Sequence, residues 1–584
     1  MTNQLKKNLG FSVGLACIFF FGAYLRLHSL SSQILLDDEW HNIIRVIQSN
    51  YVDVLTRFNP HDNSSPPLAL YNLGLYDTFG WNEFTLRLPV IVSGMLSLII
   101  LPMFVRKLFD NRVSLVFAGS LAIAPFLIFY SRFARAYGIT MLLCFLGILL
   151  FYQWLTTGRT SHAVGFVLSG ILAIYTHPSA LIAIFTPLSI ALASLAVHNT
   201  KPGASISRQI VVPLKSVLIV AAILIIPLVP LMSPMLSESG ALPWHMGSFT
   251  LNGIITAASL MSGTANWPLS VLFFLLCILG EWQLIRQNAL MGWIFFFIAF
   301  AYLLLLLVSG PIGLDVGAVL LRYMIVAVPL SLTLVAIALD GLVKRFQAVR
   351  QVHPILPNLA VVAFVGTFFV AGPLPVIDAS PNNFLDHSAF QGSYVPHTWE
   401  RSVAIGVYPP YTIGKDQVAP FYRSLGEQFE IKAVIEYPFD ICDYNDLFYY
   451  YQHFDKKRIL AGYCTDPALI GYSVPQSSDQ ESFTVGMLTV DDILSRVSDR
   501  SKLHFSNMVD VSDSVNLLTN RADVIILHKY IMALKIVPND VDPVRTYGRI
   551  RVDYQSVPLL RTRFEKAFGP PTYEDEQIVC FKIK

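Results

Sequence analysis

The sequence predicts a polytopic α-helical membrane protein, with about 11 transmembrane helices, that ends in a C-terminal extracytoplasmic α/β domain. Three observations predict this fold class. The chain of 584 residues is 54% hydrophobic and only 14% charged. Its first 376 residues contain repeated apolar runs that are long enough to cross a bilayer. From residue 377 onward these runs stop, and Asp, Asn, Ser, Tyr and Lys become common.

The composition excludes two classes of protein. Soluble globular proteins carry about a quarter charged residues, well above the 14% of this chain. The formal net charge of +2 gives no basic field that would favour a nucleic-acid partner. No cysteine spacing is typical of a zinc site. Cys442 and Cys464 lie in the polar third of the chain, and a disulfide between them stays open because spacing alone does not fix pairing.

A spanning helix needs about 20 apolar residues, and that rule selects eleven segments. They are residues 10–29, 85–105, 113–131, 136–155, 162–176, 179–197, 212–233, 268–285, 290–309, 320–341 and 356–376. The first segment follows Lys6 and Lys7 without a small-residue cleavage site, so we interpret it as an uncleaved transmembrane helix.

The short loops determine the orientation, because positively charged loops stay cytoplasmic. Most positive loop residues fall on one side of the predicted segments: Lys6, Lys7, Arg106, Lys107, Arg112, Arg159, Lys201, Arg208, Lys215, Arg286, Lys344, Arg345 and Arg350. We therefore expect a cytoplasmic N-terminus and, after eleven crossings, an extracytoplasmic C-terminal third. The two long connections, 30–84 and 234–267, then lie on the outer side.

The first outer loop, residues 30–84, is too polar to cross a membrane. Apolar residues recur at helical spacing between Asp38 and Phe58, which predicts an amphipathic helix lying on the membrane surface. The turn-rich segment from Asn59 to Pro67 interrupts it, and a second short helix is expected from about Leu68.

The C-terminal part, residues 377–584, has the length and pattern of one α/β domain. Strand-like runs lie at Val403–Val407, Lys432–Glu436, Val524–Leu527 and Ile578–Phe581, and a helical pattern lies at Val490–Val497. Residues 1–376 would then form the transmembrane domain.

An acidic cluster directly follows the first predicted span. Asp37, Asp38 and Glu39 are consecutive, and His41 lies two residues further on. Carboxylates at the end of a membrane helix are costly unless they are solvated or paired. A solvated helix end, or an N-cap by Asp38, is the structural interpretation. A catalytic role is favoured by the three consecutive acids and by the amphipathic helix that would hold them at the interface.

Arginines at the outer ends of two other segments are the second constellation. Arg132, Arg135 and Tyr137 lie in the outer turn between the third and fourth spans, and Arg322 lies at the outer end of the tenth. Such arginines either reach lipid headgroups or bind phosphate or carboxylate through their guanidinium forks. His177, in the tight turn Thr176-His177-Pro178, is either a structural residue or a further site candidate.

These motifs, in this order, resemble the GT-C glycosyltransferases. The carriers of the resemblance are an Asp-Glu pair after the first span, Pro66-Pro67-Leu68 in the same loop, Arg87-Leu88-Pro89, the run from Tyr130 to Tyr137, and Leu321-Arg322-Tyr323. The branch that the chain resembles includes aminoarabinose transferases of lipid A, protein O-mannosyltransferases and core-sugar transferases of rhizobial lipopolysaccharide. The resemblance covers residues 1–376 and, more loosely, the C-terminal domain.

The resemblance implies roles for several residues. Asp38 and Glu39 match the family's acidic pair, with Asp38 as the base; Arg132, Arg135, Tyr137 and Arg322 match its donor-phosphate site. One position departs from the family pattern, because Ser65 stands where many members have Lys or His before Pro-Pro-Leu. His61 or an arginine would then replace that contact. The resemblance leaves open a divalent metal near Asp38 as the only cofactor.

The chemistry that these residues allow leads to the same function. A sugar hydroxyl needs a positioned carboxylate base before it can attack, and a phosphate leaving group needs cationic stabilisation. We therefore expect a transferase, inverting by a single displacement, on the outer face of a bacterial inner membrane. Its partners would be membrane lipids, a polyprenyl-phosphate sugar and a glycolipid, polysaccharide or protein acceptor. The alternatives are a lipid or sugar transporter or flippase and an oligosaccharide ligase.

Overall fold

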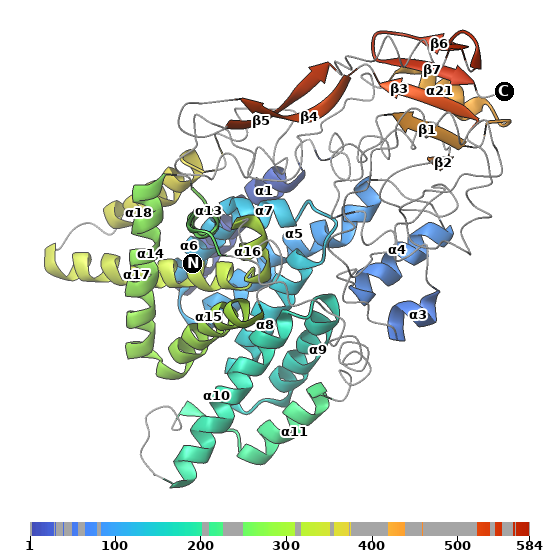
Figure 1. Ribbon diagram of the computed structural model, residues 1–584. Helices are drawn as coiled ribbons and strands as arrows, with labels where there is room; N and C mark the ends of the chain where they lie inside the picture. Colours follow the sequence, from blue (N-terminus) through green and yellow to red (C-terminus); the bar gives the residue numbers. More distant parts are fainter. Residues whose placement is uncertain are drawn as a thin grey trace.

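The fold is described from a computed structural model, shown in Figure 1. The described residues are 3–27, 30, 39, 50–56, 65–78, 83–200, 209–225, 249–264, 266–309, 317–350, 355–372, 374, 419–431, 433–437, 458–459, 523–528, 530–537, 544–551, 565–566 and 568–582. Helices form one body, and the strands lie together at one end of it (Figure 1). The helices α10 and α11 reach toward the opposite end.

Six helices in the described ranges are long and apolar enough to cross a membrane. They are α1 (Asn3–Leu27), α5 (Glu83–Leu108), α8 (Tyr137–Thr157), α14 (Trp267–Gln287), α15 (Ala289–Ser309) and α17 (Ala327–Arg350). Further apolar helices are α6 (Asn111–Ile123), α9 (Thr160–Thr176), α10 (Ala180–Thr200), α11 (Leu214–Ile225), α13 (Leu251–Ser262) and α18 (Ile355–Val370). Each predicted segment overlaps at least one described helix, so the polytopic helical fold is confirmed; the number of crossings stays a prediction.

The predicted third segment, 113–131, is not one helix. The helix α6 ends at Ile123, and α7 (Pro125–Tyr130) begins after one intervening residue, Ala124. Pro125 lacks a backbone N–H and its ring clashes with the preceding turn, so the helix is interrupted there. This break leaves carbonyl groups at the end of α6 that other groups must satisfy. The candidate site described below lies next to this break.

The predicted tenth segment, 320–341, is also interrupted. Arg322 lies in a separate short helix, α16 (Gly317–Tyr323), and α17 begins only at Ala327. The expectation that Arg322 ends a continuous span is therefore wrong. Pro329 occupies the first turn of α17, where its missing N–H costs no helical hydrogen bond. A new helix start at this point is consistent with that preference.

Close helix packing fixes the body around the site. The residue Gly280 of α14 lies so close to α17 that a Cβ atom there would be 2.0 Å from the carbonyl oxygen of Leu334. Association of helices in lipid depends on such small residues, because lipid tails remove the hydrophobic driving force between them. Any side chain larger than hydrogen at position 280 would separate α14 from α17.

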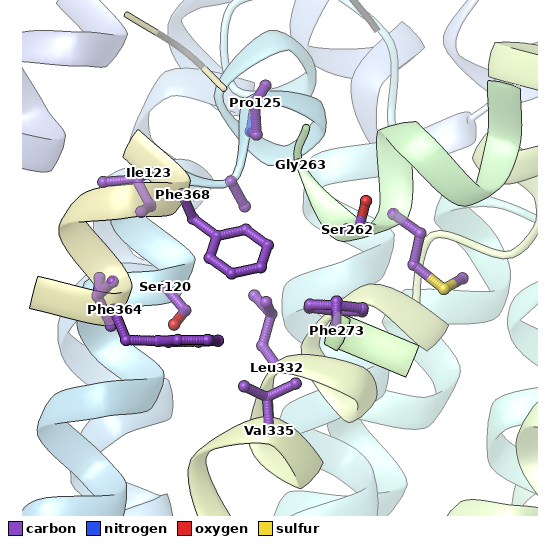
Figure 2. A pocket seen from close by; sticks show the side chains of 13 residues that line it. Ser120, Ile123, Pro125, Ser262, Gly263, Phe273, Leu332, Val335, Phe364 and Phe368 are labelled. Carbon is purple, nitrogen blue, oxygen red and sulfur yellow. The ribbon is translucent and has the colours of Figure 1, made fainter. Parts of the chain in front are cut away.

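An apolar pocket lies between α6, α14, α17 and α18, beneath Pro125 and Gly263 (Figure 2). Phenylalanine side chains line much of it, and Ser120 and Ser262 supply side-chain hydroxyl groups. The hydroxyl of Ser262 already bonds the carbonyl of Ser259 and the hydroxyl of Ser270. No residue that lines this pocket is titratable near neutral pH, so acid–base chemistry has to be sought elsewhere.

Two helices of the first outer loop are described, α3 (Tyr51–Thr56) and α4 (Pro66–Thr78). The helix expected from about Leu68 is thus confirmed, beginning two residues earlier at a proline that suits a first helical turn. Val54 of α3 packs against Ala69 and Leu73 of α4. Most of the amphipathic helix predicted for 38–58 lies outside the described residues.

The C-terminal part contains a five-stranded sheet of order β2-β1-β3-β7-β6. Its strands are β1 (Ala433–Tyr437), β2 (Arg458–Ile459), β3 (Val524–His528), β6 (Tyr573–Glu574) and β7 (Ile578–Lys582), and the short helix α21 (Pro420–Glu427) precedes β1. Strands β2, β1 and β3 are parallel, whereas β7 and β6 run antiparallel. A separate hairpin joins β4 (Tyr530–Val537) to β5 (Val544–Arg551).

Three of the four predicted strands therefore form; they are the runs in β1, β3 and β7. Their residues are almost all apolar, as a strand buried on both faces requires. The fourth run, Val403–Val407, the helix at Val490–Val497 and the cysteines Cys442 and Cys464 lie outside the described residues. The boundary at residue 377 stays a prediction.

Candidate functional site

Glu39 links helix α5 to the turn of residues 131–136. Its Oε1 accepts the Nε–H of Arg87 at 2.8 Å and its Oε2 accepts the Nη2–H at 2.7 Å, which makes a bidentate pair. Oε1 also accepts the backbone N–H of Ala134 at 2.6 Å. Glu39 and Arg87 are 1% and 2% exposed. Glu39 thereby holds the start of α5 against this turn.

Arg26 donates hydrogen bonds to carbonyl groups at the helix break before Pro125. The carbonyl of Leu121 would normally accept from residue 125, but that residue is a proline without an N–H. Arg26 donates from Nη2 to the carbonyl of Leu121 at 3.2 Å and from Nη1 to that of Ala122 at 3.1 Å. A third bond runs from its Nε to the Oγ of Ser131 at 3.2 Å. The buried side chain thus ties α1 to the start of the outer turn.

Arg132 connects the turn of residues 131–136 to the end of α1. Its Nη1 donates to the carbonyl of Arg26 at 3.2 Å and to that of Leu25 at 3.5 Å, both in the last turn of α1. Arginine commonly satisfies the free carbonyls at a helix C-terminus in this way. The residue Gly94 of α5 makes room for the junction, because a Cβ there would lie 2.3 Å from the Oγ of Ser131.

A second group includes Arg135 of the same turn, and we call it the Arg–His cluster: Arg135, Tyr137, His177, Arg322 and Tyr323. The Tyr137 ring is 4.9 Å from that of His177, centre to centre. The Cζ of Arg322 lies 5.7 Å from the centre of the Tyr137 ring and 5.4 Å from that of Tyr323. The cluster therefore joins the start of α8, the α9–α10 turn and α16.

His177 is the neutral member of the cluster. Burial first, and then the positive charges of Arg135 and Arg322, lower the pKa of His177 to about 3. The backbone N–H of Ser179 donates to its Nδ1 at 3.2 Å, and the Ser179 hydroxyl lies 2.8 Å from the same atom. The cluster thus contains two guanidinium groups beside one neutral imidazole.

Arginine side chains gather around the turn of residues 131–136. They are Arg26, Arg87, Arg132, Arg135 and Arg322, and Glu39 is a described carboxylate among them. A phosphate, with its several acceptor oxygens, suits guanidinium donors.

Several sequence-predicted residues lie outside the described part of the chain. They are Asp37, Asp38, His41 and His61. Within the described part, no group of three His, Cys, Asp or Glu side chains could hold a metal ion. The sequence-predicted metal ligand, Asp38, lies outside the described residues, so a divalent metal stays a prediction.

Sequence reasoning gave no role to Arg26, which the structure places at the centre of the junction. The sequence could have indicated a role for Arg26, because Arg26 lies at the predicted outer end of the first span. A positive residue there breaks the orientation rule in the same way as Arg132 and Arg135, which the sequence did single out.

The fold is that of the GT-C membrane proteins. The solved structure of ArnT from Cupriavidus metallidurans in the apo state matches over 99% of this chain and 98% of its own, at 12% identity and a TM-score of 0.51. This agreement confirms the fold predicted from the order of the motifs.

Two further solved structures are similar at lower scores. ArnT of the same organism bound to undecaprenyl phosphate is 14% identical, with 92% and 98% of the two chains covered and a TM-score of 0.46. AglB, an oligosaccharyltransferase from Archaeoglobus fulgidus in complex with an inhibitory peptide and a dolichol-phosphate, is 14% identical over 94% and 75%, with a TM-score of 0.47. No protein-family model and no curated protein sequence matches this chain.

Proposed function

We propose that this protein is a membrane glycosyltransferase that moves a sugar from a polyprenyl phosphate to an acceptor on the outer face of the cytoplasmic membrane. One observation carries the proposal. The turn of residues 131–136 joins the Glu39–Arg87 bridge, which follows directly on Asp38, to the Arg–His cluster. A base and an anion site therefore have a common support.

Asp38 is the proposed general base. It precedes the anchored Glu39 by one peptide unit, and consecutive Cα atoms are about 3.8 Å apart. The side chain of Glu39 accepts bonds from Arg87 and from the backbone N–H of Ala134, and the sequence position of Asp38 next to it supports the proposal. A carboxylate there takes the proton of the acceptor hydroxyl as that oxygen attacks the anomeric carbon.

The Arg–His cluster is the proposed site of the donor phosphate, with Arg135 and Arg322 as the charged ligands. The phosphodiester of the donor carries one negative charge, and the departing polyprenyl phosphate carries up to about two, since its second pKa is about 6. Two fixed guanidinium groups match the departing state better than the bound donor. Such differential stabilisation accelerates bond cleavage, whereas equal binding of both states does not.

Glu39 and Arg132 act by positioning in this mechanism. Both oxygens of Glu39 accept bonds from protein N–H groups, and Arg132 donates to the end of α1. Glu39 therefore holds the turn while Asp38 performs the proton transfer. Tyr137 contributes by packing between His177 and Arg322. No step needs a metal, and any metal would depend on Asp38.

The test is product formation by the purified protein in lipid nanodiscs. A labelled polyprenyl-phosphate sugar is supplied with envelope extracts, and products are identified by mass spectrometry; a deletion strain should lack the same product. We expect sugar to appear on a glycolipid, polysaccharide or protein. An Arg286→Gln variant, changed at an exposed arginine at the predicted cytoplasmic end of α14, serves as the control. Movement of the lipid without any product would instead indicate a flippase.

A further inference from the structure

The ring of His177 has one nitrogen whose role the proposed mechanism has not used. His177 lies in the turn between α9 and α10, is 7% exposed, and carries the hydrogen bonds of Ser179 on Nδ1. The other nitrogen, Nε2, is buried and has no hydrogen-bond partner among the described residues. A buried polar group without a partner destabilises the fold, so its presence needs a reason.

The protonation of the ring follows from its geometry. A backbone N–H can only donate, so the bond from Ser179 N–H requires a lone pair on Nδ1. The one proton of the neutral ring is then on Nε2. An imidazolium would place a second donor against the Ser179 N–H, which the structure does not allow. Ser179 thus fixes the tautomer, and Nε2–H is a donor.

That donor lies among the aromatic and cationic groups of the Arg–His cluster. The ring centre of His177 is 4.9 Å from that of Tyr137 and 6.3 Å from that of Tyr323. The charges of Arg135 and Arg322 both act on it. An N–H donor beside two guanidinium groups suits an anion that has more than one acceptor oxygen.

We propose that His177 is a further phosphate-binding residue, which donates from a neutral Nε2–H to an oxygen of the polyprenyl phosphate, and that Ser179 is its positioning residue. The identity of the anion rests on the proposed function. A neutral donor adds a directed hydrogen bond without a third positive charge beside Arg135 and Arg322. The site therefore binds phosphate with two cations and one dipolar donor.

The test is direct binding of a lipid phosphate to the full-length protein in nanodiscs. Undecaprenyl phosphate is the probe, and undecaprenol, which lacks the phosphate, is the reference ligand. His177→Asn removes the donor at the Nε2 position and should weaken phosphate binding about tenfold. His177→Gln places an amide N–H near that position and should stay within about threefold of wild type. His162→Asn, on a histidine that contacts Thr157, is the matched control.

The outcomes separate this inference from the proposed function, because neither sugar nor acceptor is present. Selective binding by wild type that is lost in His177→Asn and kept in His177→Gln supports the inference, even if no transferase product is ever found. Equal binding by wild type and His177→Asn overturns it. So does a failure of wild type to prefer the phosphate over the alcohol.

Nitrogen NMR of protein labelled in histidine tests the role of Ser179. The signals that disappear in His177→Gln should be those of a ring protonated on Nε2 with a bare Nδ1. Ser179→Ala keeps the backbone N–H and should keep this pattern, with phosphate binding within about threefold of wild type. An imidazolium pattern, or protonation on Nδ1, would contradict the assignment.

Discussion

Two groups of arginines meet at the turn of residues 131–136, and their surroundings differ. Arg26, Arg87 and Arg132 donate to helix-end carbonyls or to the carboxylate of Glu39. Arg135 and Arg322 instead act on a neutral histidine, and Arg322 lies over tyrosine rings. The residue type is the same in the two groups, but Arg322 is partly exposed whereas the other four arginines are buried. The contacts shown for the first group are with protein acceptors, and those shown for Arg322 are with the rings of Tyr137 and Tyr323.

The largest expected effect comes from the base that this turn supports. Asp38→Asn removes proton abstraction and should lower the transfer rate by about 10²–10⁴-fold. Binding of undecaprenyl phosphate should persist, since the Arg–His cluster is intact. Product formation and lipid binding are measured on the same nanodisc preparation. Transfer at the wild-type rate would mean that the base is another group.

The pair of Glu39 and Arg87 should be a stability determinant. Glu39→Gln leaves a buried guanidinium without its counter-charge, which typically costs about 3–5 kcal/mol. The double variant Glu39→Gln/Arg87→Met should recover part of that loss, because no lone buried charge remains. Thermal unfolding of the purified protein measures both.

An exposed ion pair provides the control for that experiment. Lys344, whose side chain is 60% exposed, pairs with Asp110 at 3.0 Å and also with Asp340, which keeps Arg112 as a second partner at 2.8 Å. Exposed pairs are worth about 0–1 kcal/mol, so Lys344→Gln should shift the unfolding midpoint little. If Glu39→Gln left the thermal unfolding midpoint unchanged while abolishing sugar transfer, Glu39 would be a catalytic residue rather than a residue that positions the turn.

Exchanging one arginine from each group gives the sharpest contrast between them. Arg322→Gln should weaken binding of undecaprenyl phosphate by about 10–100-fold, as loss of a charge-assisted bond does, and leave the unfolding midpoint nearly unchanged. Arg26→Gln should do the reverse, because the carbonyls of Leu121 and Ala122 lose their donors. Both variants are measured for binding and for melting. Equal effects on both quantities would remove the distinction.

The smallest effect concerns pH. The pKa of His177 is lowered to about 3, first by burial and then by Arg135 and Arg322. At a pH below about 6.5, the ordinary pKa of histidine, His177 binds a proton in the unfolded chain but stays neutral in the folded chain. This group therefore costs stability progressively as the pH falls from about 6.5 toward 3, by about 2 kcal/mol at pH 5. His177→Gln should lose less thermal stability than wild type between pH 7.5 and pH 5.

The sequence by itself determined the fold class and most of the helices. Apolar runs of membrane length are set by the thickness of the bilayer, and they can be read without any tertiary contact. The strands in β1, β3 and β7 were likewise visible as short apolar runs. The order of the motifs also led to Arg135 and Arg322, because arginine is conspicuous at the outer end of an apolar segment.

Only the tertiary structure decided which residue each arginine meets. Hydropathy averages over a window, so it did not register the single missing N–H at Pro125 or the helix start near Pro329. Bonds such as those from Arg26 to Leu121 and from Arg87 to Glu39 join residues 95 and 48 positions apart. No local pattern encodes such pairings, since they depend on how the helices pack. The tautomer of His177 likewise depended on the path of the backbone at Ser179.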